Sequence, residues 1–434
     1  MTADTQNTIC CNNVEKAVQE LQSYKGKTIA VGLSGGVDSS TVLALLARAG
    51  ARVFGISMKI YNPEAGTVPE GIDACYGPGE TEDFALCASM CKSLGVPYHV
   101  IDCAKAYEER ILSYFRREYL AGRTPNPCVR CNLEMKFGFM LEEARRHNLD
   151  FDYFATGHYV RIAVRNGVLH LQKATDNAKD QSYFLYRLPP ETLAKLIFPL
   201  GKHTKREVKE LARSLRLPTA DKAESQDFVG GAYSLLFDNT TPGDMVDETG
   251  KVLGRHRGII HYTIGQRRGL GVSSTGEPYY VLAINADKNQ VVLSTNKRLF
   301  SNSLEGSDVV LHDRALGAQP FRAFVKIRQA HAPARATVCV QTDGSAATAY
   351  TNAKVDSADN ESSASGAGGA RDADGLGPAA VRIIFDEPQR AIAPGQSAVF
   401  YDDDGFVLGG CIIERGIGLM TTPTVMSKDN LPTT

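Results

Sequence analysis

The sequence predicts an α/β protein with a doubly wound parallel sheet, followed by a small mostly-β central domain and a C-terminal β-barrel. Short apolar strands alternate with amphipathic helices up to about residue 220, and β runs joined by turns replace them afterwards. A chain of 434 residues also exceeds one ordinary core. We therefore expect an N-terminal extension at 1–25, domains at 26–220, 221–302 and 303–420, and a tail at 421–434.

The alternation begins with a buried-strand pattern from Thr28 to Leu33, a glycine-rich turn and a helix that ends at Gly50. Strands separated by helices form parallel sheets, whose ligands bind at the carboxyl ends of the strands. A binding site is therefore expected where these strands end. The same signals predict further strands at 52–61, 98–103 and 151–159, and helices at 81–95, 106–122, 133–148 and 201–216.

The later part of the chain has the alternation and turns typical of antiparallel strands. Hairpins are expected within 279–295 and 397–415, and further strands at 321–329, 336–341 and 381–385. Residues 343–378 interrupt this pattern with a stretch that has almost no large apolar side chain. Such a segment cannot offset its ordering entropy, so we predict a disordered insertion in a barrel loop.

Composition favours a cytoplasmic protein without membrane contact. The polar N-terminus has no apolar signal core, and no run approaches the roughly 18 apolar residues of a membrane span. Cytosolic thiols stay reduced, so the ten cysteines are better explained as core residues, reactive thiols or metal ligands than as disulfides. The net charge of −1 does not indicate a nucleic-acid binder, so any RNA contact must come from local basic patches.

A turn with the chemistry of a phosphate site follows the first strand and reads GLSGGVDSS, from Gly32 to Ser40. It lacks the Gly-Lys-Ser/Thr ending of a Walker A loop. Gly35 and Gly36 allow the backbone to approach an anion, and the N-terminus of the next helix points at the same place. Asp38 beside a phosphate indicates a magnesium ion. An ordinary strand–helix turn with capping residues is the alternative.

Two cysteines, Cys128 and Cys131, are separated by two residues in the loop RTPNPCVRCN. The spacing is found in redox pairs, in half of a zinc site and in iron–sulfur sites.

Basic segments lie at 201–216, 261–271 and 321–336, and the sequence leaves two interpretations of them open. They are either solvated faces or surfaces that contact a phosphate backbone.

Together these stretches resemble the tRNA-specific 2-thiouridylases. The resemblance implies an ATP-pyrophosphatase domain of the adenine nucleotide alpha hydrolase-like type, a small central domain and a C-terminal barrel. It also implies that ATP adenylates the C2 oxygen of the wobble uridine U34 in tRNA, and that sulfur then replaces this oxygen. The stretches that carry it, across roughly residues 26–420, are GLSGGVDSS, AGRTPNPCVRCN, EMKFG, ATGHYVR, KDQSYFL, ESQDF, HYTIGQRRGLG and APGQSAVFY.

The resemblance also implies residue roles, cofactors and partners. The implied catalytic residue is Cys131, and we expect Cys128 and Asp38 to be catalytic with it. The implied ATP-binding residues are Gly32, Leu33, Ser34, Gly35, Gly36, Val37, Asp38, Ser39, Met58 and Gly157. The implied tRNA-binding residues are Asn126, Pro127, Cys128, His158, Lys179, Asp180, Gln181, Arg328, Gln329 and Gln396. The cofactors are ATP and Mg²⁺, and the partners are tRNA and a sulfur donor, either a protein or inorganic sulfide.

Two positions depart from the family. Many members have Asp in place of Cys128, and many have a second catalytic cysteine in place of Val229. We therefore predict that Cys128 and Cys131, with Cys75 as the third ligand, hold an iron–sulfur cluster (4Fe-4S). Structural zinc prefers four protein ligands, whereas a cluster on three thiolates leaves one iron open to carry hydrosulfide. The alternative keeps Cys131 as a persulfide carrier that is resolved by Cys128.

Two other functions stay open from the sequence. A different ATP-pyrophosphatase, a ligase or amidotransferase acting on a small molecule, would need neither the basic barrel nor the cysteine loop. A non-catalytic RNA-binding or zinc-structural protein would not need Asp38 and the Ser-Gly-Gly turn.

Overall fold

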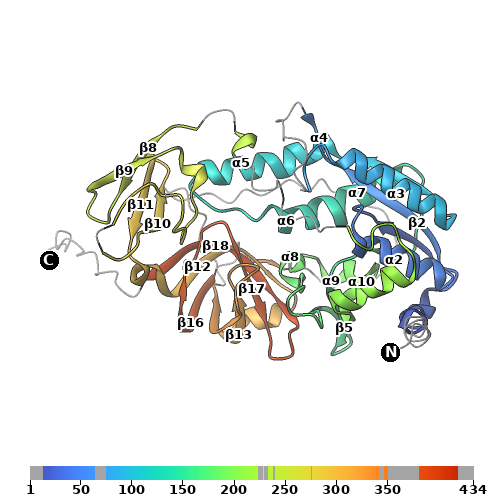
Figure 1. Ribbon diagram of the computed structural model, residues 1–434. Helices are drawn as coiled ribbons and strands as arrows, with labels where there is room; N and C mark the ends of the chain where they lie inside the picture. The colour runs from blue at the N-terminus through green and yellow to red at the C-terminus, as the bar shows by residue number, and fades with distance from the viewer. Residues whose placement is uncertain are drawn as a thin grey trace, which may run out of the picture.

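The computed structural model describes residues 13–63, 75–222, 228, 233–237, 240–274, 276–341, 347–349 and 381–418. These residues form three parts (Figure 1): a sheet domain that begins near the N-terminus, a small β domain and a barrel. The predicted order of an α/β domain, a mostly-β domain and a barrel is confirmed. No helix in the described ranges is long and apolar enough to cross a membrane.

The sheet domain is built on five parallel strands in the order β3-β2-β1-β4-β7. The strands are β1 (Thr28–Gly32), β2 (Arg52–Lys59), β3 (Tyr98–Asp102), β4 (Tyr153–Ala155) and β7 (Leu196–Ile197). Helices α2 (Val37–Arg48), α3 (Glu80–Leu94), α7 (Met140–Arg146) and α10 (Lys205–Ser214) cover the sheet. Because every strand runs in the same direction, the turns after β1 and β4 meet at one edge.

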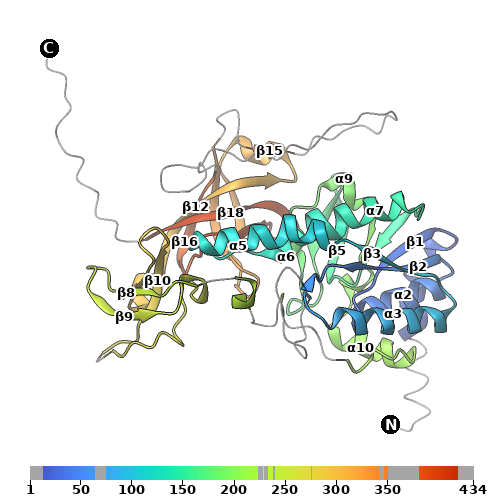
Figure 2. The ribbon, with the colours of Figure 1, turned by 90° about the horizontal axis from the view of Figure 1, so that it is seen from above.

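A helix with irregular turns crosses from the sheet domain toward the central domain (Figure 2). It comprises α4 (Ala104–Tyr107), a π-helical turn at Glu108–Leu112 and α5 (Ser113–Leu120). A second helix begins with α6 (Pro127–Arg130), continues as a π-helical segment from Cys131 to Phe139 and ends with α7. The sequence predicts helices at 106–122 and 133–148 but not their π-helical turns. The predicted loop at 123–132 is wrong in its second half, because Pro127 takes the first helical position, where its missing N–H costs no hydrogen bond.

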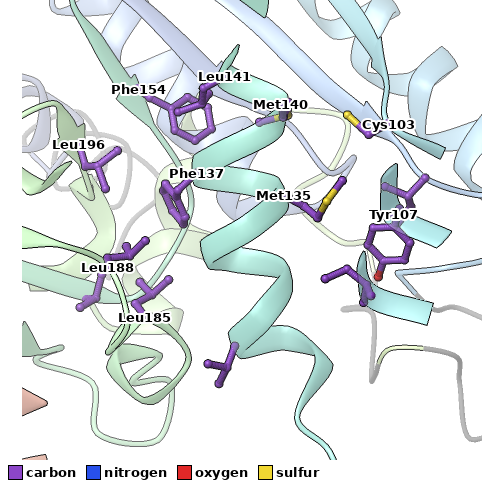
Figure 3. Packing of buried hydrophobic residues seen from close by; sticks show 14 of the residues in the cluster. Cys103, Tyr107, Met135, Phe137, Met140, Leu141, Phe154, Leu185, Leu188 and Leu196 are labelled. Carbon is purple, nitrogen blue, oxygen red and sulfur yellow. The ribbon is translucent and has the colours of Figure 1, made fainter. Parts of the chain in front are cut away.

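The second helix packs on two sides (Figure 3). Met135 faces Tyr107 and Cys103, while Phe137 faces Phe154 and the segment that carries Leu185 and Leu188. All of these side chains are at most 7% exposed. The helix that begins with the cysteine loop is therefore anchored in the main core.

A hairpin and two short helices connect β4 to β7. The hairpin pairs β5 (Val160–Arg165) with β6 (Val168–Lys173), and α8 (Ser182–Leu185) and α9 (Pro190–Leu193) follow it. The central domain is a four-stranded sheet in the order β10-β11-β8-β9. Its strands are β8 (Gly243–Val246), β9 (Val252–His256), β10 (Tyr280–Asn285) and β11 (Gln290–Ser294), and the predicted β10–β11 hairpin is confirmed.

The barrel closes because β12 pairs with both β16 and β18. Its six strands are β12 (Phe300–Leu311), β13 (Phe321–Lys326), β14 (Ala334–Val340), β16 (Val381–Arg390), β17 (Ser397–Tyr401) and β18 (Val407–Gly418). A three-residue strand, β15 (Ala347–Ala349), lies beside β12. The rest of the predicted insertion at 343–378, the tail at 421–434 and residues 1–12 of the predicted extension lie outside the described residues.

Candidate active site

The turn between β1 and α2 lies at the edge where the parallel strands end. Gly35 has a φ of +70°, which an L side chain rarely adopts, so the turn needs glycine there. The Ser34 amide donates to Ser39 Oγ at 3.2 Å, and the hydroxyl of Ser40 donates to the Gly36 carbonyl at 2.8 Å. The turn is thus a compact backbone cradle at the N-terminus of a twelve-residue helix, where anions bind favourably.

A cleft of about 320 Å³ opens over this turn. It brings together nearly all of the predicted ATP-binding residues, namely Gly32, Leu33, Ser34, Gly36, Val37, Asp38, Ser39, Met58 and Gly157. Two lysines that the sequence analysis did not single out, Lys136 and Lys222, also line it. The cleft therefore has an anion cradle at one end and cations on its walls.

The carboxylate of Asp38 already has close partners within the protein. Lys205 Nζ lies 2.8 Å from each of its oxygens, and the Tyr159 hydroxyl donates to Oδ1 at 2.8 Å. Asp83, on α3, forms an ion pair with Lys222 and lies against Gly35. Asp38 therefore contacts α10 and Tyr159, the residue before β5, rather than standing free in the cleft.

A second cavity of about 300 Å³ contains the predicted sulfur chemistry. Cys75, Cys128 and Cys131 all line it, together with Pro127 and Tyr107. The two cavities adjoin, because both are lined by Leu33, Ser34, Met58, Cys75, Lys136, His158 and Gln181. A group held at the boundary would face the phosphate turn on one side and the cysteines on the other.

Burial shifts the pKa values of two groups that line the second cavity, Cys131 and His158. Burial raises the pKa of the Cys131 thiol to about 11, while the Lys136 ammonium acts to lower it and the Tyr107 hydroxyl hydrogen-bonds to the sulfur. Burial also holds the pKa of His158 well below its usual range, with Lys136 acting in the same direction. His158 is therefore neutral near pH 7 and shares a hydrogen bond with Thr156 Oγ1 at 2.8 Å.

Cys75, Cys128 and Cys131 are the candidate ligands of a metal group. Although they line one cavity, no three His, Cys, Asp or Glu side chains within the described ranges converge closely enough to hold a metal ion. In this arrangement the residues do not fit a cluster, and its ligation stays a prediction. Val229, at the position of the expected second cysteine, lies outside the described residues.

Several predicted tRNA-binding residues make hydrogen bonds within the protein. Asp180 is 2% exposed, and its carboxylate accepts hydrogen bonds from the Ala174 and Ser182 amides. Gln181 Oε1 accepts from the Tyr159 amide at 2.9 Å. The others make similar contacts: Gln329 donates to the Asp180 carbonyl, Gln396 donates to the Thr124 and Pro125 carbonyls, and Asn126 accepts from the Val129 amide.

Two more of the predicted tRNA-binding residues are also partly exposed. Lys179 and Arg328 are half-buried, so solvent reaches part of each side chain. Nothing in the described structure tests whether they touch RNA, and these roles stay predictions.

The sequence analysis missed the two lysines of the first cleft, Lys136 and Lys222, because their positions depend on long-range folding. Lys222, for example, pairs with Asp83, which is far away in the chain.

Comparison with known proteins identifies the family of this chain. Family models match residues 27–230 (tRNA methyl transferase HUP domain), 237–295 (tRNA methyl transferase PRC-barrel domain) and 375–413 (aminomethyltransferase beta-barrel domain). The tRNA-specific 2-thiouridylase MnmA of Endomicrobium trichonymphae is 39% identical over 392 residues, which are 89% of this chain and 98% of that protein. The chain belongs to the tRNA-specific 2-thiouridylase family. A further 2-thiouridylase, from Carboxydothermus hydrogenoformans, is 37% identical over 399 residues, covering 90% of this chain and 98% of that one.

Solved structures resemble this member of the 2-thiouridylase family only distantly. The U34-tRNA thiolase NcsA from Methanococcus maripaludis aligns with a TM-score of 0.32 and 18% identity, covering 49% of this chain and 65% of that chain.

Proposed function

We propose that this protein is a tRNA-specific 2-thiouridylase, which uses ATP to replace the C2 oxygen of U34 in tRNA with sulfur and releases AMP and pyrophosphate. The observation that carries the proposal is the shared boundary of the two cavities. The reaction needs an α-phosphate, the uridine C2 carbon and a sulfur atom close together, and adjoining phosphate and cysteine cavities can provide this arrangement.

In the proposed first step, ATP lies in the cleft with its phosphates on the turn from Ser34 to Ser39. The uridine C2 oxygen attacks the α-phosphorus, and pyrophosphate leaves. Backbone N–H groups at the N-terminus of α2 and the ammonium groups of Lys136 and Lys222 stabilise the charge that develops on the phosphates. Mg²⁺ would neutralise part of the charge on the ATP phosphates, and the paired state of Asp38 makes that residue an organiser of the turn.

In the proposed second step, a sulfur nucleophile attacks C2 of the adenylated uridine and AMP leaves. Cys131 and Cys128 line the cavity that faces this carbon, and Lys136 lies where it favours a negatively charged sulfur. A persulfide on Cys131 can deliver the sulfur: its outer sulfur bonds to C2 as AMP leaves, and Cys128 then attacks Cys131 Sγ, which releases the 2-thiouridine and leaves a Cys128–Cys131 disulfide. The cluster on Cys75, Cys128 and Cys131 stays the alternative prediction, and no step is derived through it. Iron and sulfide analysis after anaerobic purification, with single alanine variants at the three cysteines, separates the routes.

The proposal is tested by separating the two substrates. The Ser34→Ala variant removes a hydroxyl from the phosphate turn and leaves the barrel unchanged, so we expect loss of ATP-dependent adenylation with nearly unchanged tRNA affinity in a filter-binding assay. Mass analysis of tRNA nucleosides then asks whether 2-thiouridine is formed. ATP cleavage stimulated by a small acid or by ammonia, and not by tRNA, would instead identify a ligase or amidotransferase.

A further inference from the structure

The cysteine loop is attached to the barrel by a buried ionic contact. Arg123, at the start of the loop, is 7% exposed. Its guanidinium lies 2.7 Å from Glu118 of α5 and 2.6 Å from Glu414 of β18, and it donates to the Ile413 carbonyl at 3.3 Å. Glu414 also accepts from the Ser307 hydroxyl on β12. The charge of Arg123 is thus neutralised partly by the last strand of the barrel.

A barrel turn makes further hydrogen bonds to the backbone of the next two loop residues. The Thr124 amide donates to the Pro394 carbonyl at 2.7 Å. The Gln396 side-chain amide donates to the Thr124 carbonyl at 3.0 Å and to the Pro125 carbonyl at 3.3 Å. Gly395, with a φ of +88°, approaches Thr124 so closely that an added Cβ would lie 3.0 Å from its backbone. The turn and the loop fit together without room for a side chain.

The distance in sequence from this contact to the cysteines is short. Pro125 and Pro127 restrict the chain, and Asn126 Oδ1 caps the first turn of α6 at the Val129 amide. Cys128 lies on α6, and Cys131 begins the π-helical segment. A displacement of the Thr124 backbone would therefore be transmitted to both cysteines.

We propose that Gln396 is a positioning residue. Together with the Arg123–Glu414 pair, it holds Cys128 and Cys131 in the second cavity, which adjoins the cleft over the phosphate turn. The relevance to sulfur transfer rests on the proposed function, whereas the effect on the cysteines does not. The side-chain NH2 group of Gln396 donates to two loop carbonyls, and in this proposal its part in recognition of tRNA is indirect. The barrel then sets the geometry of the cysteine loop in addition to any contact with RNA.

The test uses Gln396→Ala, which removes both hydrogen bonds and leaves no buried charge. The rate of modification by N-ethylmaleimide is measured separately at each cysteine by peptide mass spectrometry. We expect the modification rates at Cys128 and Cys131 to rise roughly tenfold. The loss of two hydrogen bonds should make local opening of the cysteine loop more frequent by about this factor. The rate at Cys339, on the far barrel strand β14, should not change.

Two matched variants and a second readout complete the design. Arg165→Gln removes an ion pair between β5 and Asp402 of the barrel, a contact that does not involve the cysteine loop. Gln396→Glu keeps the size of the side chain but cannot donate, so it should behave like Gln396→Ala. In the thiolation assay both Gln396 variants should lower kcat by roughly tenfold, with the KM for ATP and the Kd for tRNA unchanged.

Three results would overturn the proposal. The first is an unchanged modification rate at Cys128 and Cys131 in Gln396→Ala, and the second is an equal rise in Arg165→Gln. The third is a weaker Kd for tRNA at unchanged cysteine reactivity, which would make Gln396 a direct RNA contact. If the wild-type protein makes no 2-thiouridine, the proposed function fails, but the modification rates still decide the positioning role.

Discussion

Lys205 Nζ lies 2.8 Å from both carboxylate oxygens of Asp38, so the first turn of α10 is attached to the first turn of α2. The Tyr159 hydroxyl completes the arrangement at 2.8 Å. The Lys205 side chain is only 11% exposed, and the Asp38 side chain is 28% exposed. Because the ion pair is largely shielded from solvent, removal of one partner leaves the other charge poorly compensated.

We therefore expect Lys205→Met to impair the phosphate turn without touching the cysteine cavity. The unpaired Asp38 carboxylate should reduce the free energy of unfolding by about 1–3 kcal/mol and lower ATP–pyrophosphate exchange by roughly tenfold. Thermal unfolding and exchange of labelled pyrophosphate measure the two effects. Arg206→Met is the matched control, because Arg206 is on the same helix with a side chain that is 86% exposed. Equal losses in the two variants would contradict the prediction.

Lys136 should influence the reactivity of Cys131. The lysine ammonium acts against the burial that raises the pKa of this thiol to about 11, so Lys136→Met should raise that pKa further. We expect alkylation of Cys131 by iodoacetamide near pH 8 to slow by roughly threefold to tenfold. Peptide mass spectrometry measures the rate at each cysteine. An unchanged rate at Cys131 in a folded variant would remove Lys136 from the proposed sulfur step.

Glu80 should make stability depend on pH. Burial raises the pKa of its carboxyl to about 7 from an ordinary 4.5, although it accepts hydrogen bonds from the Ile60 and Tyr61 amides. The favourable contribution of Glu80 to the free energy of unfolding is therefore complete below pH 4.5 and is lost as the pH rises through 7. The Tm of the wild type minus that of Glu80→Gln should fall across this window. Glu82→Gln, an exposed position on α3, is the control and should give a flat difference.

Removal of the insertion should leave the barrel intact. Val340 at the end of β14 pairs directly with Val381 at the start of β16, so a short turn can join the two strands. We expect replacement of residues 350–378 by an Asn-Gly turn to change Tm by less than about 2 °C and to leave thiolation unchanged. A second variant that also removes β15 measures the contribution of that strand. A large drop in Tm for the first variant would show that the segment contributes to stability.

Strands and turns of the sheet domain could be predicted because their signals are local. The apolar run at Thr28, the glycine turn after it and the stop at Gly50 each act within a few residues. The residues of the phosphate turn were found for the same reason. β7 and the β5–β6 hairpin were not predicted, since β7 has only two residues and its place depends on pairing with β4.

The parts of the site that were missed depend on geometry beyond the local sequence. Lys136 comes five positions after Cys131, a spacing that puts side chains on different faces of an α-helix but on nearly the same face of a π-helix. Lys205 belonged to a basic helix of ambiguous role, and its partner Asp38 is 167 residues away. Gln396 was expected to contact tRNA, and only the folded barrel reveals its bonds to Thr124 and Pro125.

The span of 291 residues between Arg123 and Glu414 has a consequence for synthesis of the protein on the ribosome. The parallel sheet and its phosphate turn consist of residues before 220, so a nascent chain can fold them early. Arg123 must wait for its partner on β18 until nearly all of the barrel has been translated. A truncated translation product would therefore retain the cleft over the turn between β1 and α2 while its cysteine loop lacks the barrel contacts, which separates the proposed binding of ATP from the proposed sulfur transfer in time.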